Sequence, residues 1–265
     1  MSRLATTPGV RRVRHRLRAR VSEHPSIYLP FASHKYRDLS PRVLDDTTEM
    51  VLDGYTRSAS TFAVYALQLA QDRPVRLAHH LHAPAQLIAG VRAGLPTLLV
   101  IREPRGAILS QLVREPGVAM RDALIAYVRF HRCLARYTDG MIVGEFETVT
   151  RDFGSVIRRV NAKFGLALQE FVHTPEAVAE CRAMIEQRGT LSPLLLGFET
   201  GMVPREVARA AARELAASAA LGELRDAWVP SQSRSAAKER LEREWSRPGL
   251  KGLREQAHDI YLEVR

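Results

Sequence analysis

Residues 53–62 read DGYTRSASTF, and they directly follow the apolar run Met50-Val51-Leu52. A short apolar run, a turn that contains glycine and then small hydroxyl residues before Phe62 are typical of a strand that turns into a helix. The first amides of such a helix have no intrahelical acceptor and carry the positive end of the helix dipole. The stretch therefore predicts an anion site at the carboxyl end of a strand. A simple turn with serine caps at Ser58 and Ser60 remains the alternative.

The segments that follow alternate between strand-like and helix-like patterns. The apolar run PTLLVIR at 96–102 is typical of a central parallel strand that is covered on both faces. The other expected strands are 49–54, 74–81 and 140–146. The expected helices are 61–71, 84–93, 104–113, 118–136 and 153–165. This order predicts an α/β fold, a three-layer parallel sheet flanked by helices.

The chain divides into a lead-in and one larger domain. Residues 1–47 are expected to form a basic helix at 11–21 followed by an irregular segment that contains three prolines. Residues 48–265 are expected to form a single α/β domain that becomes mainly helical from 168 onward. Within it we expect helices at 205–221, 236–245 and 249–264, and a loop at 229–235.

The 265 residues carry a formal net charge of +10 with 46% hydrophobic residues. This composition is that of an ordinary soluble domain, and the positive charge favours an anionic partner. A high-GC genome tends to encode chains that are rich in arginine and alanine, which explains the same charge without a partner. No apolar run reaches the length of a membrane span, and no apolar region follows the basic N-terminus as in a secretory signal. An organelle transit peptide is the alternative reading of that start. Cys133 and Cys181 fit a reducing compartment, so we expect a cytoplasmic protein.

The basic segment 11–21 places Val13, Leu17 and Val21 four residues apart among arginines. That spacing predicts a short basic amphipathic helix. It is either a solvated arm or a surface that contacts a membrane or the acceptor.

The loop at 53–62 lacks the lysine of an ATP-binding loop. A nucleotide kinase has a Gly-Lys-Ser/Thr triplet where this chain has Ala59-Ser60-Thr61. Arg57 supplies a cation upstream instead. A second arginine, Arg102, ends the central strand, and Ser110 lies eight residues further on, about two helical turns away. A guanidinium at the carboxyl edge suits a phosphate, although a surface salt bridge is the commoner role of such an arginine.

These motifs have a family resemblance when they are taken together. YTRSASTF at 55–62 resembles the YPKSGTTW phosphosulfate loop of the PAPS-dependent sulfotransferases, and IREPRGAILSQ at 101–111 resembles their RxPxxxxxS motif. GEFETV at 144–149 and Phe164-Gly165 resemble their YEDL and FLG segments. The resemblance extends in order from about 48 to 166, and we expect a bacterial member of that family with its P-loop-like fold.

The resemblance implies a site for the donor PAPS and its product PAP. Arg57, Ser58, Ala59, Ser60, Thr61 and Phe62 would hold the 5′-phosphosulfate, and Arg102 and Ser110 the 3′-phosphate. The family's C-terminal glycine-rich segment has no clean match here. Arg234 and Lys238 are the first candidates to complete the 3′ site, and Arg247 and Lys251 are the second. The family lysine is replaced by Arg57, which keeps the charge but is a poor proton donor.

The expected general base is a histidine in RLAHHLHAPAQL at 76–87. The family's histidine lies two residues before a proline, which selects His82; the alternative alignment selects His80. Strand alternation predicts that His80 and His82 share a face while His79 points away. Some relatives use a carboxylate, so Glu103 and Asp53 remain alternatives. A metal site at His80 and His82 lacks a third ligand at suitable spacing, and no metal is expected.

The sequence therefore predicts an enzyme that transfers the sulfuryl group of PAPS to a hydroxyl or amine of a small-molecule, carbohydrate or lipid acceptor. The alternatives are a P-loop kinase or nucleotide hydrolase, and an inactive basic module for anions or nucleic acid. No nucleic-acid motif is visible, and only 6% of the residues are aromatic.

Overall fold

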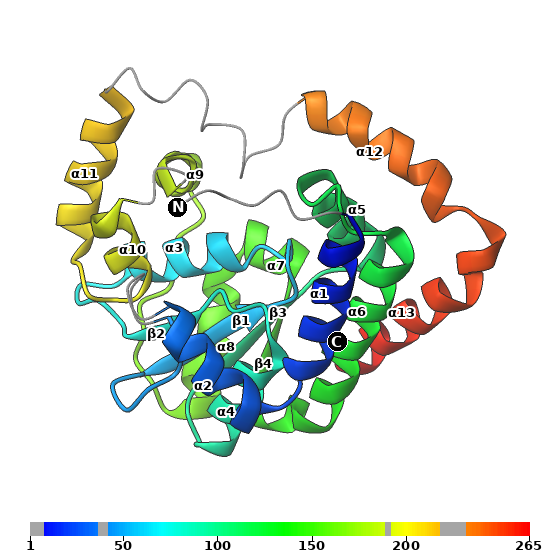
Figure 1. Cartoon of the computed structure of the whole chain (residues 1–265). Helices are drawn as coiled ribbons and strands as arrows, with labels where there is room; N and C mark the ends of the chain where they lie inside the picture. Colours follow the sequence, from blue (N-terminus) through cyan, green and yellow to red (C-terminus); the bar gives the residue numbers. More distant parts are fainter. Residues whose placement is uncertain (1–7, 37–41, 189–191, 218–231) are drawn as a thin grey trace.

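The computed structural model describes residues 8–36, 42–188, 192–217 and 232–265 (Figure 1). Its centre is a four-stranded parallel sheet in the order β2-β1-β3-β4. The strands are β1 (Met50–Gly54), β2 (Leu77–His79), β3 (Thr97–Ile101) and β4 (Ile142–Glu145). All carboxyl ends meet at one edge, because each strand is paired in parallel with its neighbour.

Alternate residues of the central strands enter two different cores. Met50, Leu52 and Leu98 pack into one core with α3 (Ser60–Ala70), α7 (Phe146–Arg151) and α8 (Phe153–Phe164). Val51 and Leu99 pack into the other with the remaining central helices. These helices are α4 (Pro84–Arg92), α5 (Pro104–Arg114) and α6 (Met120–Leu134). The expected three-layer α/β fold with a parallel sheet is confirmed.

The chain from 168 onward is mainly helical, as predicted. Its helices are α9 (Pro175–Gln187), α10 (Pro193–Glu199), α11 (Arg205–Ala217), α12 (Gln232–Trp245) and α13 (Lys251–Val264). In Figure 1, α9 to α11 lie together on the left, and α9 and α10 contact α3. On the right, α12 contacts α5 and α13 contacts α6. Two 3₁₀ helices, η1 (Ala135–Gly140) and η5 (Pro248–Leu250), precede β4 and α13.

The N-terminal part contains two helices, α1 (Pro8–Val21) and α2 (Pro25–Tyr36). The prediction of an irregular segment after 21 was therefore wrong over Pro25–Tyr36. Pro25 is tolerated at the first position of a helix, where the amide has no intrahelical acceptor, but Pro30 lies inside α2. Burial of Tyr28 and Ala32 against the segment around Leu81 stabilises the helix in spite of that proline.

Several predicted boundaries also moved. The strand expected at 74–81 is only Leu77–His79, because the residues after it leave the extended conformation. The loop expected at 229–235 is helical from Gln232 onward, and residues 229–231 lie outside the described part of the chain. The helix expected at 205–221 ends at Ala217 within the described residues. No helix among the described residues has the length and apolarity that crossing a bilayer requires.

Candidate functional site

The loop between β1 and α3 is held in a tight turn against β3. Arg57 and Ala59 adopt left-handed backbone conformations with φ of 68° and 73°. Gly54 allows the close approach: a Cβ there would lie 2.1 Å from the carbonyl oxygen of Val100 and 3.1 Å from Ser60 Oγ. Left-handed conformations at non-glycine residues are costly and persist where the surroundings enforce them, often at functional sites.

The first turn of α3 presents unpaired donors to this loop. No side chain caps the helix at Ala59, and the bond from the amide of Ala63 to the carbonyl of Ala59 (3.0 Å) is the first of the helical pattern. The amides before Ala63 therefore lack an intrahelical acceptor. The hydroxyls of Ser58 and Ser60 are buried and have no hydrogen-bond partner. A buried hydroxyl without a partner is unfavourable, and an anion in the loop would relieve that cost.

The two arginine motifs meet at this loop. Arg57 Nε donates to Ser110 Oγ at 2.9 Å, and Arg102 Nη1 donates to the carbonyl of Arg57 at 3.1 Å. The loop after β1, the end of β3 and the second turn of α5 thus form one polar cluster. The structure brings Arg57, Ser58, Ser60, Arg102 and Ser110 together at one edge of the sheet.

One contact to its side chain and one to its backbone hold Arg102. Its guanidinium lies 3.9 Å from the centroid of the Phe146 ring, and its carbonyl accepts from the hydroxyl of Tyr127 at 2.6 Å. Burial lowers the pKa of Arg102, but an arginine remains cationic at any physiological pH. Phe146 was not among the predicted site residues; its position directly after β4, at the same sheet edge, was the available signal.

The histidine segment after β2 lies beside the loop, but its geometry differs from the prediction. His80 and His82 have φ of 55° and 47°, so they are not strand residues and do not alternate. His79 Nδ1 faces His80 Nδ1, whereas strand alternation predicted that His79 points away. His80 Nε2 pairs with Thr61 Oγ1 at 2.9 Å. Burial holds the pKa of both His79 and His80 well below the usual value, which favours their neutral forms.

His82 is the histidine with the geometry of a base. Its Nδ1 lies 2.9 Å from the carbonyl oxygen of Gly54, which can only accept, so Nδ1 carries the proton. The lone pair therefore resides on Nε2. The side chain of His82 is 26% exposed, whereas that of His80 is 3% exposed and engaged by Thr61. The arrangement favours His82 over His80 for proton transfer with an external group.

Both carboxylate alternatives have structural partners. Asp53 is fully buried and accepts the amides of Gly54 at 2.9 Å, Leu81 at 3.0 Å and His82 at 3.0 Å. Asp53 thereby fixes the position of the histidine segment. Glu103 accepts the amide of Gly106 at 2.6 Å and caps α5.

A buried acidic residue, Glu199, was missed by sequence reasoning. Its carboxylate accepts from Arg188 and from the hydroxyl of Tyr65 at 3.1 Å, and it lies 3.7 Å from His80 Nδ1. Potential ligand atoms of His79, His80 and Glu199 lie within 4.8 Å of one another, which is a spacing that could hold a metal ion. Because Arg188 already balances the carboxylate, the set is explained by an ion pair and hydrogen bonds. Nothing in the sequence links α10 to the histidines.

The C-terminal candidates are only partly placed. The backbone positions of Arg234 and Lys238 belong to α12, and their side chains lie outside the described residues. The ion pair between Arg105 Nη2 and Glu242 Oε1, at 2.9 Å, attaches α12 to the start of α5. The role of Arg234 and Lys238 at a 3′-phosphate stays a prediction.

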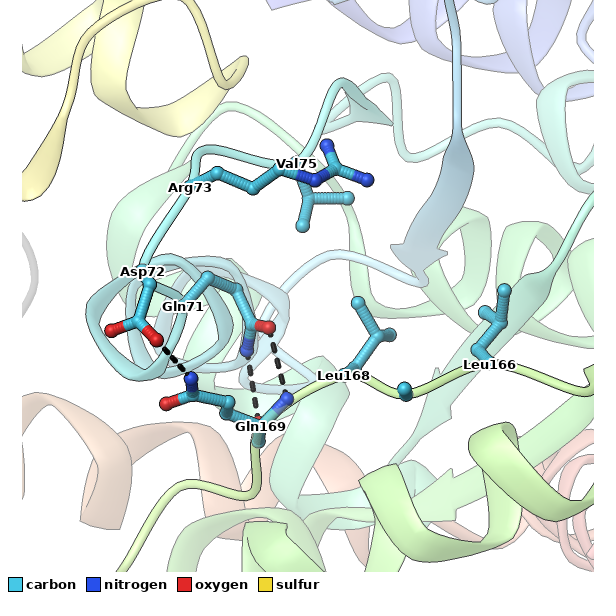
Figure 2. A pocket seen from close by; sticks show the side chains of 8 residues that line it. Gln71, Asp72, Arg73, Val75, Leu166, Leu168 and Gln169 are labelled. Carbon is cyan, nitrogen blue, oxygen red and sulfur yellow. Dashed lines mark hydrogen bonds between the residues drawn. The ribbon is translucent and has the colours of Figure 1, made fainter.

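A pocket of about 320 Å³ lies at the other end of α3 from this loop (Figure 2). Gln71 and Gln169, which both line the pocket, exchange two hydrogen bonds, at 2.9 and 3.0 Å. Asp72 and Arg73 line its rim, and each is also in an ion pair with a residue outside the pocket. None of the residues that line the pocket belongs to the candidate site, so the pocket is separate from it.

Comparisons of the chain with protein-family models, curated proteins and solved structures find no match.

Proposed function

We propose that the chain is a sulfotransferase that uses PAPS as the sulfuryl donor and a small-molecule, carbohydrate or lipid hydroxyl or amine as the acceptor. The observation that carries this proposal is the hydrogen bond from Arg57 Nε to Ser110 Oγ, at 2.9 Å. It joins a loop suited to one anionic group to a second motif suited to another. PAPS carries anionic groups on both its 5′ and its 3′ side.

The residues present fit the two ends of this donor. The amides of the first turn of α3 and the buried hydroxyls of Ser58 and Ser60 would hold the 5′-phosphosulfate. Ser110 and the guanidinium of Arg102 would hold the 3′-phosphate. Arg57 lies between them and would contribute a fixed positive charge to the transferred group.

The proposed reaction is an in-line displacement at sulfur. The acceptor oxygen or nitrogen forms a bond to sulfur while the bond from sulfur to the bridging oxygen breaks, and PAP leaves with that electron pair. The acceptor proton passes to Nε2 of His82, whose Nδ1 is held by the carbonyl of Gly54. Arg57 stabilises the negative charge that develops on the leaving phosphate but does not protonate it.

The kinase alternative has less support from the site. Phosphoryl transfer from ATP uses a magnesium ion that a carboxylate near the loop binds. The two nearest candidates, Asp53 and Glu103, accept backbone amides instead. A binding module for nucleic acid would be supported by the net charge of +10 alone.

A thermal-shift experiment with PAP, AMP and ATP tests the donor class. We expect PAP to raise the melting temperature by about 5 to 10 °C at a concentration roughly 100 times its Kd, because ligand binding stabilises the folded state. AMP lacks the 3′-phosphate and should produce a much smaller shift. ATP should also produce a small shift.

Two variants make the test specific to the site. Arg102→Ala should remove most of the difference between PAP and AMP. Arg132→Ala changes an exposed arginine on α6 and serves as the control that keeps the difference. Stabilisation by ATP that equals or exceeds that by PAP would contradict the proposal and favour a kinase.

A further inference from the structure

Helix α1 turns an apolar stripe toward solvent. Val10, Val13 and Leu17 are 52%, 64% and 60% exposed. Their spacing of three and four residues places them on one side of the helix. Isolated exposed apolar residues are common, but a row of them along one helix face indicates a surface that another body covers.

The opposite side of α1 is attached to the rest of the molecule. Arg16 Nε pairs with Asp122 Oδ1 at 2.8 Å, and Arg18 Nη2 donates to the carbonyl of Leu81 at 2.7 Å. The side chains of His15 and Gln111 meet at 3.5 Å. Because these contacts fix the rotation of α1 against α6, the apolar stripe faces outward in a defined orientation.

The charge of α1 is wholly positive. Its sequence contains six arginines and no acidic residue. Arg14 and Arg20 are exposed and flank the apolar stripe on its two sides, and Arg12, which is also exposed, lies on another side of the same helix. Exposed apolar residues flanked by arginines are the pattern of a helix that lies in the interface of an anionic bilayer.

The next helix extends the surface. Ile27 and Phe31 of α2 are 59% and 63% exposed and lie one turn apart. Lys35, a further turn along, is also exposed. Only residues 22–24 separate α2 from α1, and both helices are drawn at the front of the molecule in Figure 1.

We propose that α1 and α2 form a docking surface for a bilayer that contains anionic phospholipid. Val13 and Leu17 would enter the boundary between headgroups and acyl chains, and the flanking arginines would bind lipid phosphates. A second copy of the chain is a poor occupant, because it would bring two sets of arginines together. Nucleic acid would use the arginines but leave the apolar stripe without a role.

The surface adjoins the candidate site. Arg18 binds the carbonyl of Leu81, which lies between His80 and His82. Docking through α1 would therefore hold the histidine segment close to the bilayer. The inference does not depend on sulfuryl transfer, since the residues of the stripe are not part of the proposed donor site.

Vesicle flotation with the full chain tests the proposal. Vesicles of phosphatidylcholine alone are compared with vesicles that also contain phosphatidylglycerol, at low and at high salt. We expect binding to the anionic vesicles only, weakened by salt. The variant Arg12→Gln/Arg14→Gln/Arg20→Gln should bind about 100-fold more weakly, given the contribution of each arginine near a charged surface.

Matched controls separate local effects from the change in composition. Arg132→Gln/Arg151→Gln/Arg213→Gln removes the same charge from exposed positions elsewhere and should bind like the unmodified chain. Val13→Ser/Leu17→Ser should lose binding by at least about 10-fold. Its control, Val172→Ser/Leu262→Ser, changes side chains that are 69% and 52% exposed elsewhere and should keep binding. Circular dichroism and the melting temperature confirm that each variant is folded.

Four results would overturn the proposal: no binding to either vesicle, equal binding to both, full binding by Val13→Ser/Leu17→Ser, or equal losses in the α1 charge variant and its control. Polyuridylate serves as the competing probe. Tighter binding to polyuridylate that is unaffected by Val13→Ser/Leu17→Ser would identify a nucleic-acid surface and would also overturn it.

Discussion

Arg57 and Ser110 are separated by 53 positions in the chain, and their side chains meet at 2.9 Å between Nε and Oγ. Ser110 is on α5, which follows β3, whereas Arg57 is in the loop that follows β1. Since β1 and β3 are neighbours in a parallel sheet, their following segments start at the same edge. The contact therefore makes the position of the loop cation dependent on α5.

Replacing Arg57 by lysine separates charge from geometry. Arg57→Lys keeps a cation in the loop but lacks the Nε donor that binds Ser110, so we expect PAP affinity to fall modestly, by about 3- to 10-fold. Arg57→Ala should lose about 10- to 100-fold. Isothermal titration with PAP measures both.

Ser110→Ala completes a double-mutant cycle. Part of the cost of Ser110→Ala is the lost bond to Arg57, so its effect should be smaller by about 0.5 to 1.5 kcal/mol when Arg57 is already lysine. Strict additivity of the two changes would show that the Arg57–Ser110 bond does not contribute to the binding site.

Asp53→Asn tests how the histidine segment is held. Asp53 accepts three backbone amides, and an asparagine would place an NH₂ group against at least one of them. We expect the free energy of unfolding to fall by about 1 to 3 kcal/mol in urea titrations. Asp152→Asn is the matched control: it makes the same chemical change at an exposed helix cap and should cost less than about 1 kcal/mol. Equal costs for the two variants would mean that the amide contacts of Asp53 do not stabilise the fold.

The alternation of apolar and helical patterns was enough to predict the four strands and the helices between them. Strands such as Thr97–Ile101 are buried on both faces, and this constraint leaves a continuous apolar run in the sequence. The motifs around Arg57 and Arg102 were also visible in the sequence. Each motif lies within one short segment where a strand ends and a helix begins, so its residues keep a fixed spacing. The contact between the two motifs follows from parallel topology, which the order of elements predicts.

The features that were missed depend on contacts between distant segments. The left-handed conformations at His80 and His82 occur at residues other than glycine, so the sequence does not signal them. The carboxylate of Asp53, from β1, accepts the amides of Leu81 and His82 in this segment. The ion pair of Arg188 with Glu199 joins the end of α9 to α10. The carboxylate of Glu199 also lies 3.7 Å from Nδ1 of His80, a residue more than a hundred positions earlier in the chain. Helix α2 was missed because Pro30 argues against a helix locally, whereas the burial of Tyr28 is a tertiary effect.

The pH dependence of stability should have a contribution from His131. Burial lowers the pKa of His131 to about 4, from 6.5 in the unfolded chain. The unfolded state therefore binds this proton first, and stability is lost as the pH falls from 6.5 toward 4. Between about pH 7.5 and about pH 5 the loss from one such histidine is roughly 2 kcal/mol.

His131→Phe isolates that contribution. The ring lies among Tyr55, Tyr127 and Phe130, and its Nε2 is buried without a partner, so phenylalanine suits the site. We expect the variant to lose about 2 kcal/mol less on acidification, measured by urea unfolding at both pH values. His258→Phe, at an exposed position on α13, should leave the pH dependence of the unmodified chain in place. An unchanged pH dependence in His131→Phe would contradict the assignment.

Gly54→Ala tests the close approach of β1 to β3 that shapes the loop. An added Cβ would lie 2.1 Å from the carbonyl oxygen of Val100, and backbone on both strands would have to move. We expect a loss of about 4 kcal/mol or more in the free energy of unfolding, or no soluble protein. Gly252→Ala is the control, because its Cβ meets nothing within 4 Å and the position lies in α13. Alanine is the better helix former there and should stabilise the chain by up to about 1 kcal/mol. If Gly54→Ala unfolds at the same urea concentration as the unmodified chain, β1 and β3 are not as close to each other as the structure places them. The loop would then lack the support that holds Arg57 against Ser110.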